Sequence, residues 1–99
     1  PESELTFVYS DEEAILSFDV EAEAYIAITG ESGDTYFDGL LQPDDDLDSY
    51  NVADEETIYL NIGNTTGMTV NINDIPMEYP IEPADKIHQR FIINLKNES

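Results

Sequence analysis

Along most of this chain, hydrophobic residues stand at every second position, with polar residues between them. Between residues 57 and 62, for example, the apolar positions are Ile58, Leu60 and Ile62. Successive side chains of a β-strand point to opposite faces of a sheet, so a run of this kind buries one face and exposes the other. The pattern predicts half-buried strands at residues 5–9, 16–20, 24–29, 35–41, 57–62, 68–73 and 87–95.

Residues that favour turns separate these runs. Residues 30–34 (GESGD) predict a hairpin between their neighbours, and residues 63–67 (GNTTG) predict a second connection. Pro76 interrupts a short run at 75–79, and because proline lacks a backbone N–H this run is expected to be an edge or very short strand. The acidic stretch at 44–56 is expected to be a solvated loop.

Together these segments predict an all-β fold, a small antiparallel β-sandwich (Ig-like) of about seven or eight short strands without helices. The 99 residues fit a single domain spanning 1–99, with no room for a linker or a second domain. Hydrophobic residues make up 40% of the chain, enough for one modest core. The chain is therefore expected to fold despite its acidity.

The charge balance excludes whole classes of partner. Three Lys and Arg face 23 Asp and Glu, which gives a net charge of −20 at pH 7. Nucleic-acid binding is excluded because phosphate contacts need cations, and docking on anionic lipid is disfavoured for the same reason. The three cations, Lys86, Arg90 and Lys96, all lie near the end of the sequence. The acidic remainder is either a solvated surface or one that attracts cations or a basic partner.

The residues do not predict an enzyme. The chain has no cysteine, and its single histidine, His88, has no serine signature to complete a nucleophilic site. Phosphate-binding glycine loops and zinc-binding helical motifs are absent from the sequence. Paired carboxylates carry no signal in a chain with so many acids. No catalytic residue and no cofactor are expected.

One acidic stretch has the spacing of a calcium-binding loop. The residues that match the first, third, fifth and twelfth positions of an EF-hand loop are Asp44, Asp46, Asp48 and Glu55. However, Ser49 stands where the loop needs glycine, and the flanking runs predict strands rather than helices. A true EF-hand is not expected, and weak calcium binding by these four residues is left as a hypothesis.

The six tyrosines of the chain raise glycan binding as an alternative function. Tyrosines on one face of a sandwich can stack on sugar rings, although on a strand they more often only cover the sheet. The alternative to an interaction domain is therefore a glycan- or peptidoglycan-binding module, or a calcium-dependent wall or adhesion module. The glycan hypothesis requires several tyrosines exposed on one face. The candidates are Tyr9, Tyr25, Tyr36, Tyr50, Tyr59 and Tyr79.

The order of short motifs resembles one known family. Residues 24–28 (AYIAI) precede Gly30 and Gly33, and residues 36–40 (YFDGL) follow. Residues 58–64 (IYLNIGN), residues 70–77 (VNINDIPM) and a closing strand at 87–95 complete the series. This order resembles the extracytoplasmic C-terminal domain of the bacterial cell-shape protein RodZ. The positions that match its structural motifs are Tyr25, Gly30, Gly33, Gly39, Gly63, Asn64 and Pro76.

The resemblance implies a place and a set of partners. It implies a small β-sandwich without catalytic residues, on the extracytoplasmic face of the bacterial membrane. The chain would then be an excised fragment of a longer, single-pass membrane protein. Its partners would be wall-synthesis membrane proteins of the MreC, MreD, RodA and transpeptidase type, whereas MreB would be reached only through an absent cytoplasmic domain. The run at 75–79 could pair with a partner strand, but Pro76 and the nearby acids are expected to block pairing there.

Overall fold

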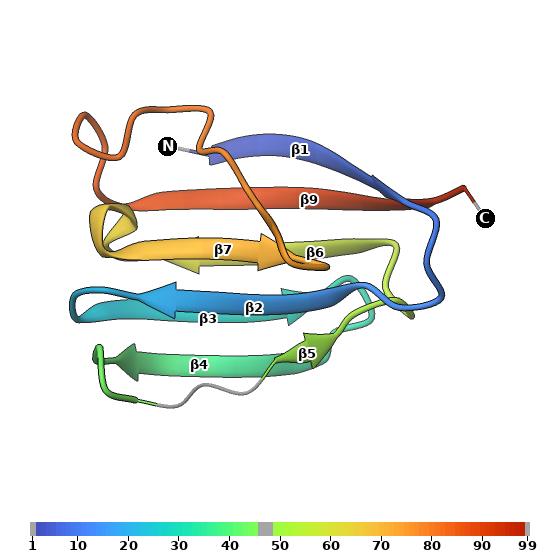
Figure 1. Ribbon diagram of the computed structural model, residues 1–99, viewed down its shortest axis with the longest axis horizontal. Helices are drawn as coiled ribbons and strands as arrows, with labels where there is room; N and C mark the ends of the chain where they lie inside the picture. Colours follow the sequence, from blue (N-terminus) through green and yellow to red (C-terminus); the bar gives the residue numbers. More distant parts are fainter. Residues whose placement is uncertain (1, 46–48, 99) are drawn as a thin grey trace.

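The computed structural model describes residues 2–45 and 49–98 and consists of two packed β-sheets (Figure 1). The first sheet has the strand order β1-β9-β6-β3-β4. Its strands are β1 (Glu2–Tyr9), β3 (Ala24–Gly30), β4 (Thr35–Leu41), β6 (Thr57–Ile62) and β9 (Gln89–Asn97). The second sheet, in the order β5-β2-β7-β8, contains β2 (Ile15–Val20), β5 (Tyr50–Asn51), β7 (Met68–Ile72) and β8 (Ile75–Pro76). A single 3-10 turn, η1 (Thr65–Gly67), connects β6 to β7.

The alternation of the sequence places the core between the sheets. On β6, Ile58, Leu60 and Ile62 are at most 1% exposed, while Tyr59 between them is 40% exposed. The same alternation holds on β3, β7 and β9, whose inward side chains meet in one cluster. The predicted all-β sandwich is confirmed, and in the described residues no helix is long and apolar enough to cross a membrane.

One strand pair departs from the expected antiparallel arrangement. β1 pairs with β9 in parallel, in a register that runs from Glu2 opposite Arg90 to Tyr9 opposite Asn97. The two strands lie near the two ends of the chain, so no hairpin links them (Figure 1). The remaining pairs of both sheets are antiparallel. The parallel pair sets Leu5 and Phe7 beside the core, where both are partly buried.

The solvated loop predicted at 44–56 is wrong for its second half. β5 pairs with β2, and the Val52 N–H donates to the Ala14 carbonyl at 2.8 Å. Val52 is fully buried and Glu55 is 6% exposed, because this segment closes one end of the sandwich. Asp44 and Asp45 are exposed as expected, whereas Asp46 and Asp48 lie outside the described residues.

The segment after β7 confirms the prediction of an edge or very short strand, since β8 has two residues and lies at the edge of the second sheet. Only Ile75 and Pro76 of the run at 75–79 form a strand, although the Met77 N–H still donates to the Val70 carbonyl at 2.8 Å. Beyond Met77 the chain leaves the second sheet and crosses over β9 towards the amino end of β1 (Figure 1). The short β8 therefore leaves the side of the sandwich next to β1 without a covering strand.

Candidate interaction surface

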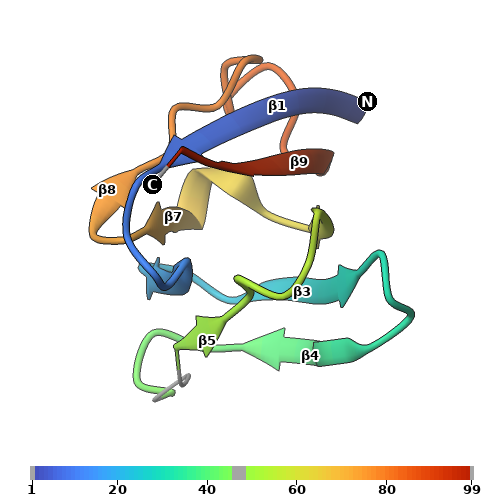
Figure 2. The same ribbon diagram turned by 90° about the vertical axis from the view of Figure 1, so that its right-hand side faces the viewer.

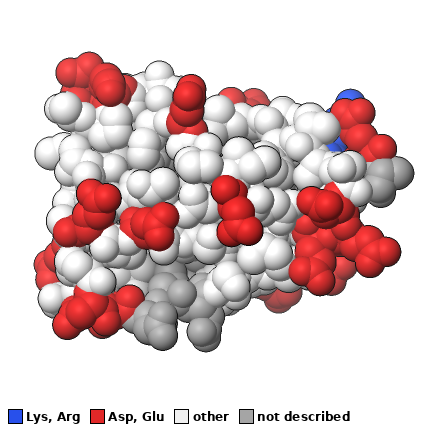
Figure 3. Space-filling view, viewed as in Figure 1, with Lys and Arg blue, Asp and Glu red and all other residues white. Residues whose placement is uncertain are grey.

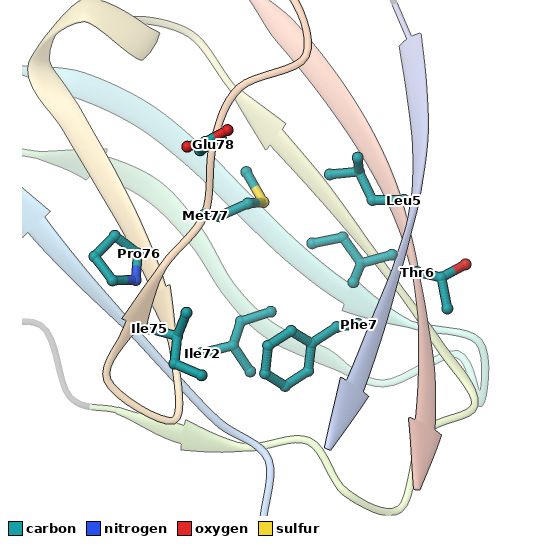
Figure 4. A pocket seen from close by; sticks show the side chains of 9 residues that line it. Leu5, Thr6, Phe7, Ile72, Ile75, Pro76, Met77 and Glu78 are labelled. Carbon is teal, nitrogen blue, oxygen red and sulfur yellow. The ribbon is translucent and has the colours of Figure 1, made fainter. Parts of the chain in front are cut away.

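A crevice opens between the edges of the two sheets, where β1 faces the segment around β8 (Figure 4). It has a volume of about 200 Å³ and a mainly apolar lining. Figure 4 shows Leu5 and Phe7 on one side and Ile75, Pro76 and Met77 on the other. Ile75 is 58% exposed, which is high for so large an apolar side chain. The crevice is thus an accessible apolar site in a molecule whose surface is otherwise rich in acids.

A tight hairpin between β7 and β8 positions the far wall of the crevice. Ile72 pairs with Ile75, so Asn73 and Asp74 form a two-residue loop. Both have positive φ angles, 51° and 65°, as a type I′ turn requires. The Asn73 side chain anchors this turn, because its Nδ2 donates to the Glu13 carbonyl and its Oδ1 accepts from the Ile15 N–H.

The crevice continues into an acidic depression at the end of β1. A space of about 340 Å³ adjoins it and shares Phe7 and Ile75 with it. A further space of about 500 Å³ is lined by Asp11, Glu12, Glu13, Ile15, Asn73 and Asp74. Acidic side chains cluster at this end of the molecule (Figure 3). We call the whole channel, from Leu5 and Met77 through Phe7 and Ile75 to Asp11–Glu13 and Asp74, the edge groove.

The groove runs beside the open edge of the first sheet. β1 is an edge strand of that sheet and, in the part of the chain that is described, pairs only with β9. Figure 2 shows β1 and β8 on the same side of the sandwich. The second backbone edge of β1 and the apolar crevice therefore lie next to one another.

Glu55 is one of the four residues that the sequence left as hypothetical calcium ligands, and the structure places its carboxylate in a hydrogen-bonded cluster. Its Oε1 accepts from the Ser32 N–H at 3.0 Å, and its Oε2 accepts from Ser32 Oγ at 2.6 Å and from the Tyr36 hydroxyl at 2.7 Å. These donors favour the charged form and hold the pKa of Glu55 below its ordinary value. Burial, with the hydrogen bond to Glu55, raises the pKa of Tyr36 to about 12.

A β-bulge explains how Tyr36 reaches Glu55. Ile28 pairs with Phe37 but Thr29 pairs with Thr35, so Tyr36 is the extra residue of β4. A bulge redirects a side chain, and here the Tyr36 ring packs partly into the core. The cluster joins the 52–56 segment to the β3–β4 hairpin, a role for which the sequence held no signal beyond the isolated Glu55.

The other calcium candidates do not join this cluster. Asp44 is exposed beside the turn after β4, and Asp46 and Asp48 lie outside the described residues. Within the described ranges, no three His, Cys, Asp or Glu side chains are grouped so as to hold a metal ion. Weak calcium binding at Asp44, Asp46, Asp48 and Glu55 stays an untested hypothesis.

The motif glycines and their neighbours have structural positions. Gly30 ends β3 directly beneath the Glu55 carboxylate, which would collide with a Cβ there, and Gly33 turns the hairpin with a φ of 98°. The Gly63 N–H donates to the Tyr25 carbonyl at 2.8 Å. The remaining motif residues lie on β4, in the loop before η1 and on β8, namely Gly39, Asn64 and Pro76.

The tyrosines do not form a stacking platform. Tyr9 is buried, the Tyr79 hydroxyl donates to the Met68 carbonyl at 2.5 Å, and the Tyr25 hydroxyl donates to Asp38 at 2.8 Å. Tyr59 lies 40% exposed on the outer face of the first sheet. The several exposed tyrosines that the glycan hypothesis requires are not gathered there in the described residues.

His88, the residue considered for catalysis, is exposed next to β9. Its Nε2 lies 2.5 Å from Asn61 Oδ1 on β6. This contact joins the start of β9 to its neighbouring strand. It gives the imidazole a structural partner on the sheet surface.

Sequence reasoning did not find the edge groove. Its walls come from segments about seventy positions apart, and the run around Phe7 predicts an ordinary half-buried strand while the run from Ile75 predicts only an edge or very short one. The available signal was Pro76, which shortens β8 and so leaves Ile75 uncovered.

Comparison with known proteins gives one finding. A family model described as the RodZ C-terminal domain matches residues 17–89, from β2 to the first residue of β9. No curated protein and no solved structure matches the chain. β1, which borders the edge groove, precedes the matched range.

Proposed function

The chain belongs to the family of RodZ C-terminal domains, and from this premise we propose that it is a non-enzymatic interaction domain of a bacterial cell-shape protein. In this proposal the domain lies on the extracytoplasmic face of the cell membrane. It acts there with the machinery that synthesises the lateral wall. The match to the family over residues 17–89 is the observation that carries the proposal.

The structure supports a binding role in two ways. In the described residues the polar clusters around Glu55, around Asn73 and around the buried Gln89 hold segments of the fold together. The edge groove, by contrast, offers an apolar surface next to an unpaired strand edge. Such a surface is suited to recognition of another protein.

The proposed partners are wall-synthesis membrane proteins of the MreC, MreD, RodA and transpeptidase type. MreB would be contacted only by a cytoplasmic part of the full protein. A membrane tether would hold the domain and its partners at high effective concentration, so weak contacts would suffice. No nucleic acid and no cofactor enter this role.

The test replaces the domain inside the full protein in its host bacterium. One strain carries the full protein with this domain exchanged for an unrelated β-sandwich of similar size, and a second carries the unaltered protein. Proximity labelling from the domain should mark wall-synthesis proteins in the unaltered strain and lose them in the exchange strain, with rounded cells. Normal cell shape and unchanged labelling in the exchange strain would refute the proposal.

A further inference from the structure

The open edge of β1 and the crevice beside it have the geometry of a single strand-binding site. A strand that paired with β1 would direct every second side chain to the inner face of the first sheet. Those side chains would lie level with Leu5 and Phe7 and opposite Ile75 and Met77. The backbone edge and the apolar crevice would then be filled by the same segment.

The edges of the two sheets differ in how they are protected. β5 and β8 have two residues each, and β8 contains Pro76. β4 carries the bulge at Tyr36. β1 has eight residues with neither proline nor a bulge in its register with β9. Short strands, prolines and bulges discourage strand pairing, so β1 is the edge most open to it.

The size of the crevice indicates whether it would bind a small molecule or the side chains of a polypeptide. Small-molecule pockets have volumes of roughly 300–1,000 Å³. The crevice, at about 200 Å³, is smaller and has an apolar lining. It suits one or two aliphatic side chains of a polypeptide better than it suits a cofactor.

The acidic side chains around the groove favour a bound segment that contains basic residues. Glu2 and Glu4 on β1 are exposed, and the groove continues to Asp11–Glu13 and Asp74. An acidic segment would be repelled there, whereas Lys and Arg would be attracted. A second copy of this chain would bring its own net charge of −20 to the same place. The charge therefore favours a basic partner segment over self-association.

Resting on the function proposed above, we propose that β1 and the edge groove bind an extended segment of a partner protein by β-strand addition. The segment has alternating aliphatic residues, which fill the crevice between β1 and β8, next to Lys or Arg residues, which face Asp11–Glu13 and Asp74. Main-chain pairing with β1 supplies affinity, and the crevice and the acidic end supply specificity.

The first experiment measures binding of labelled synthetic peptides to the purified 99-residue chain by fluorescence anisotropy. Each peptide has about eight residues, the length of β1, with alternating Ile or Val and Thr followed or preceded by Lys-Arg. At least one of the two orders should bind, and an Asp-Glu replacement of the basic pair should abolish binding. Failure of both basic orders to bind would overturn the proposal.

Backbone pairing is tested without altering the protein. Two versions of the binding peptide carry N-methyl groups on the odd or on the even residues. Only alternate N–H groups of an added strand point towards its neighbour, so one version should lose binding and the other keep it. Equal affinities of the two methylated versions would overturn strand addition.

The crevice is tested by Ile75→Glu, which places a charge where an aliphatic side chain should enter. Ile75 is already 58% exposed, so folding should persist, as a circular dichroism melt will show. Peptide affinity should fall about tenfold or more because the charge would be buried on binding. The matched control is Leu40→Glu on β4, 63% exposed and remote from the groove, which should leave affinity unchanged. Equal effects of the two substitutions would contradict the assignment of the crevice.

The acidic end is tested by two triple variants with the same change in net charge. Asp11→Asn, Glu12→Gln and Glu13→Gln together should weaken binding of the basic peptide. Glu21→Gln, Glu31→Gln and Asp44→Asn remove three exposed acids that do not line the groove and should have a smaller effect. If both triples weaken binding equally, only the overall charge attracts the peptide, and the proposed specificity is wrong.

Three further outcomes are decisive. A dimer of the chain in sedimentation, abolished by Ile75→Glu, would assign the groove to a second copy and overturn the proposal. These measurements use purified protein and so are independent of the exchange strain. Peptide binding with unchanged cell labelling would keep the site and reject the wall-synthesis role, whereas lost labelling without peptide binding would do the reverse.

Discussion

Glu55 is a buried carboxylate whose charge is stabilised by hydrogen bonds from the surrounding residues. Only 6% of it is exposed, yet Ser32 and Tyr36 supply three hydrogen bonds to its two oxygens. An unpaired buried charge is costly, and hydrogen bonds to the charged form offset that cost. Gly30 belongs to the same arrangement, because the carboxylate occupies the space a larger residue would need.

We expect Glu55→Gln to destabilise the chain at pH 7, and the loss to depend on pH. The hydrogen bonds lower the pKa of Glu55 in the folded state below the ordinary 4.5. A lowered pKa gives stability that is present above pH 4.5 and is lost as the pH falls through the folded-state pKa. Urea unfolding of the wild type and of Glu55→Gln should be measured from pH 7 downwards. The difference between their free energies of unfolding should shrink as the pH falls below 4.5.

A matched control separates this effect from the removal of one negative charge. Glu31→Gln removes an exposed carboxylate from the same hairpin and should change the free energy of unfolding by at most about 0.5 kcal/mol. A difference between wild type and Glu55→Gln that stays constant down to low pH would contradict the proposed role of the charged form.

At the scale of elements, the turn at Asn73 and Asp74 determines where β8 lies and hence where the groove has its wall. Left-handed backbone is unfavourable for residues with a Cβ, and glycine is preferred at the second position of such a turn. Asp74, with a φ of 65°, therefore occupies a position that glycine would fit better.

We expect Asp74→Gly to stabilise the chain by up to about 1 kcal/mol, because glycine removes the left-handed strain. Asp74→Asn removes the same charge but keeps the Cβ, so it measures how much of the change in stability comes from the loss of the charge. Thermal melts of the two variants should rank Gly above Asn. Equal melting temperatures of the two variants, both above that of the wild type, would mean that repulsion, and not backbone strain, limits this turn.

The alternation on β6 makes another prediction about an element. Leu60 is 1% exposed in the core, so Leu60→Ala should cost about 2–5 kcal/mol, and Leu60→Asp should not fold. The same Leu→Ala change at Leu40, which is 63% exposed, should be near neutral. Denaturant unfolding compares the variants, and a neutral Leu60→Ala would refute the assigned register.

For the whole molecule, the net charge of −20 opposes the compact state. On the face shown in Figure 3, the acids are spread over the surface as well as clustered at the end that holds the groove. At about 0.1 M ionic strength, salt largely screens the repulsion between exposed charges that are more than about 10 Å apart. The stability of this chain should therefore depend on ionic conditions more than that of a neutral sandwich.

We expect the melting temperature to rise between about 0.02 M and 0.5 M NaCl, since screening weakens the self-repulsion. Calcium and magnesium, compared at equal ionic strength against a chelator, should raise it equally. A shift of roughly ten degrees with calcium alone would indicate specific binding. That result would assign a metal site to Asp44, Asp46, Asp48 and Glu55, against our expectation of screening alone.

Much of the fold was predictable because strand burial is a local property. A residue such as Leu60 is buried or exposed according to its parity in the strand, and the turn residues at 30–34 and 63–67 mark where strands end. The family resemblance was predictable for the same reason, since its motifs combine short strands with the turns between them, and the match over residues 17–89 confirms it.

The candidate site was less predictable, because its parts are remote in sequence. Phe7 and Ile75 meet only because β1 pairs in parallel with β9 and β8 ends at Pro76. From the sequence, Glu55 was interpreted as a hypothetical calcium ligand. Its hydrogen-bond donors lie about twenty positions away, so the local sequence did not show its structural role.

The sequence by itself thus determined most of the strands, the turns between them, the buried face and the acidity, all of which follow from the order of neighbouring residues. Only the tertiary structure decided which edges pair, which acid is buried and where an apolar groove stays open. These outcomes depend on contacts between distant segments, and a period of two along each strand carries no information about which strand lies beside it.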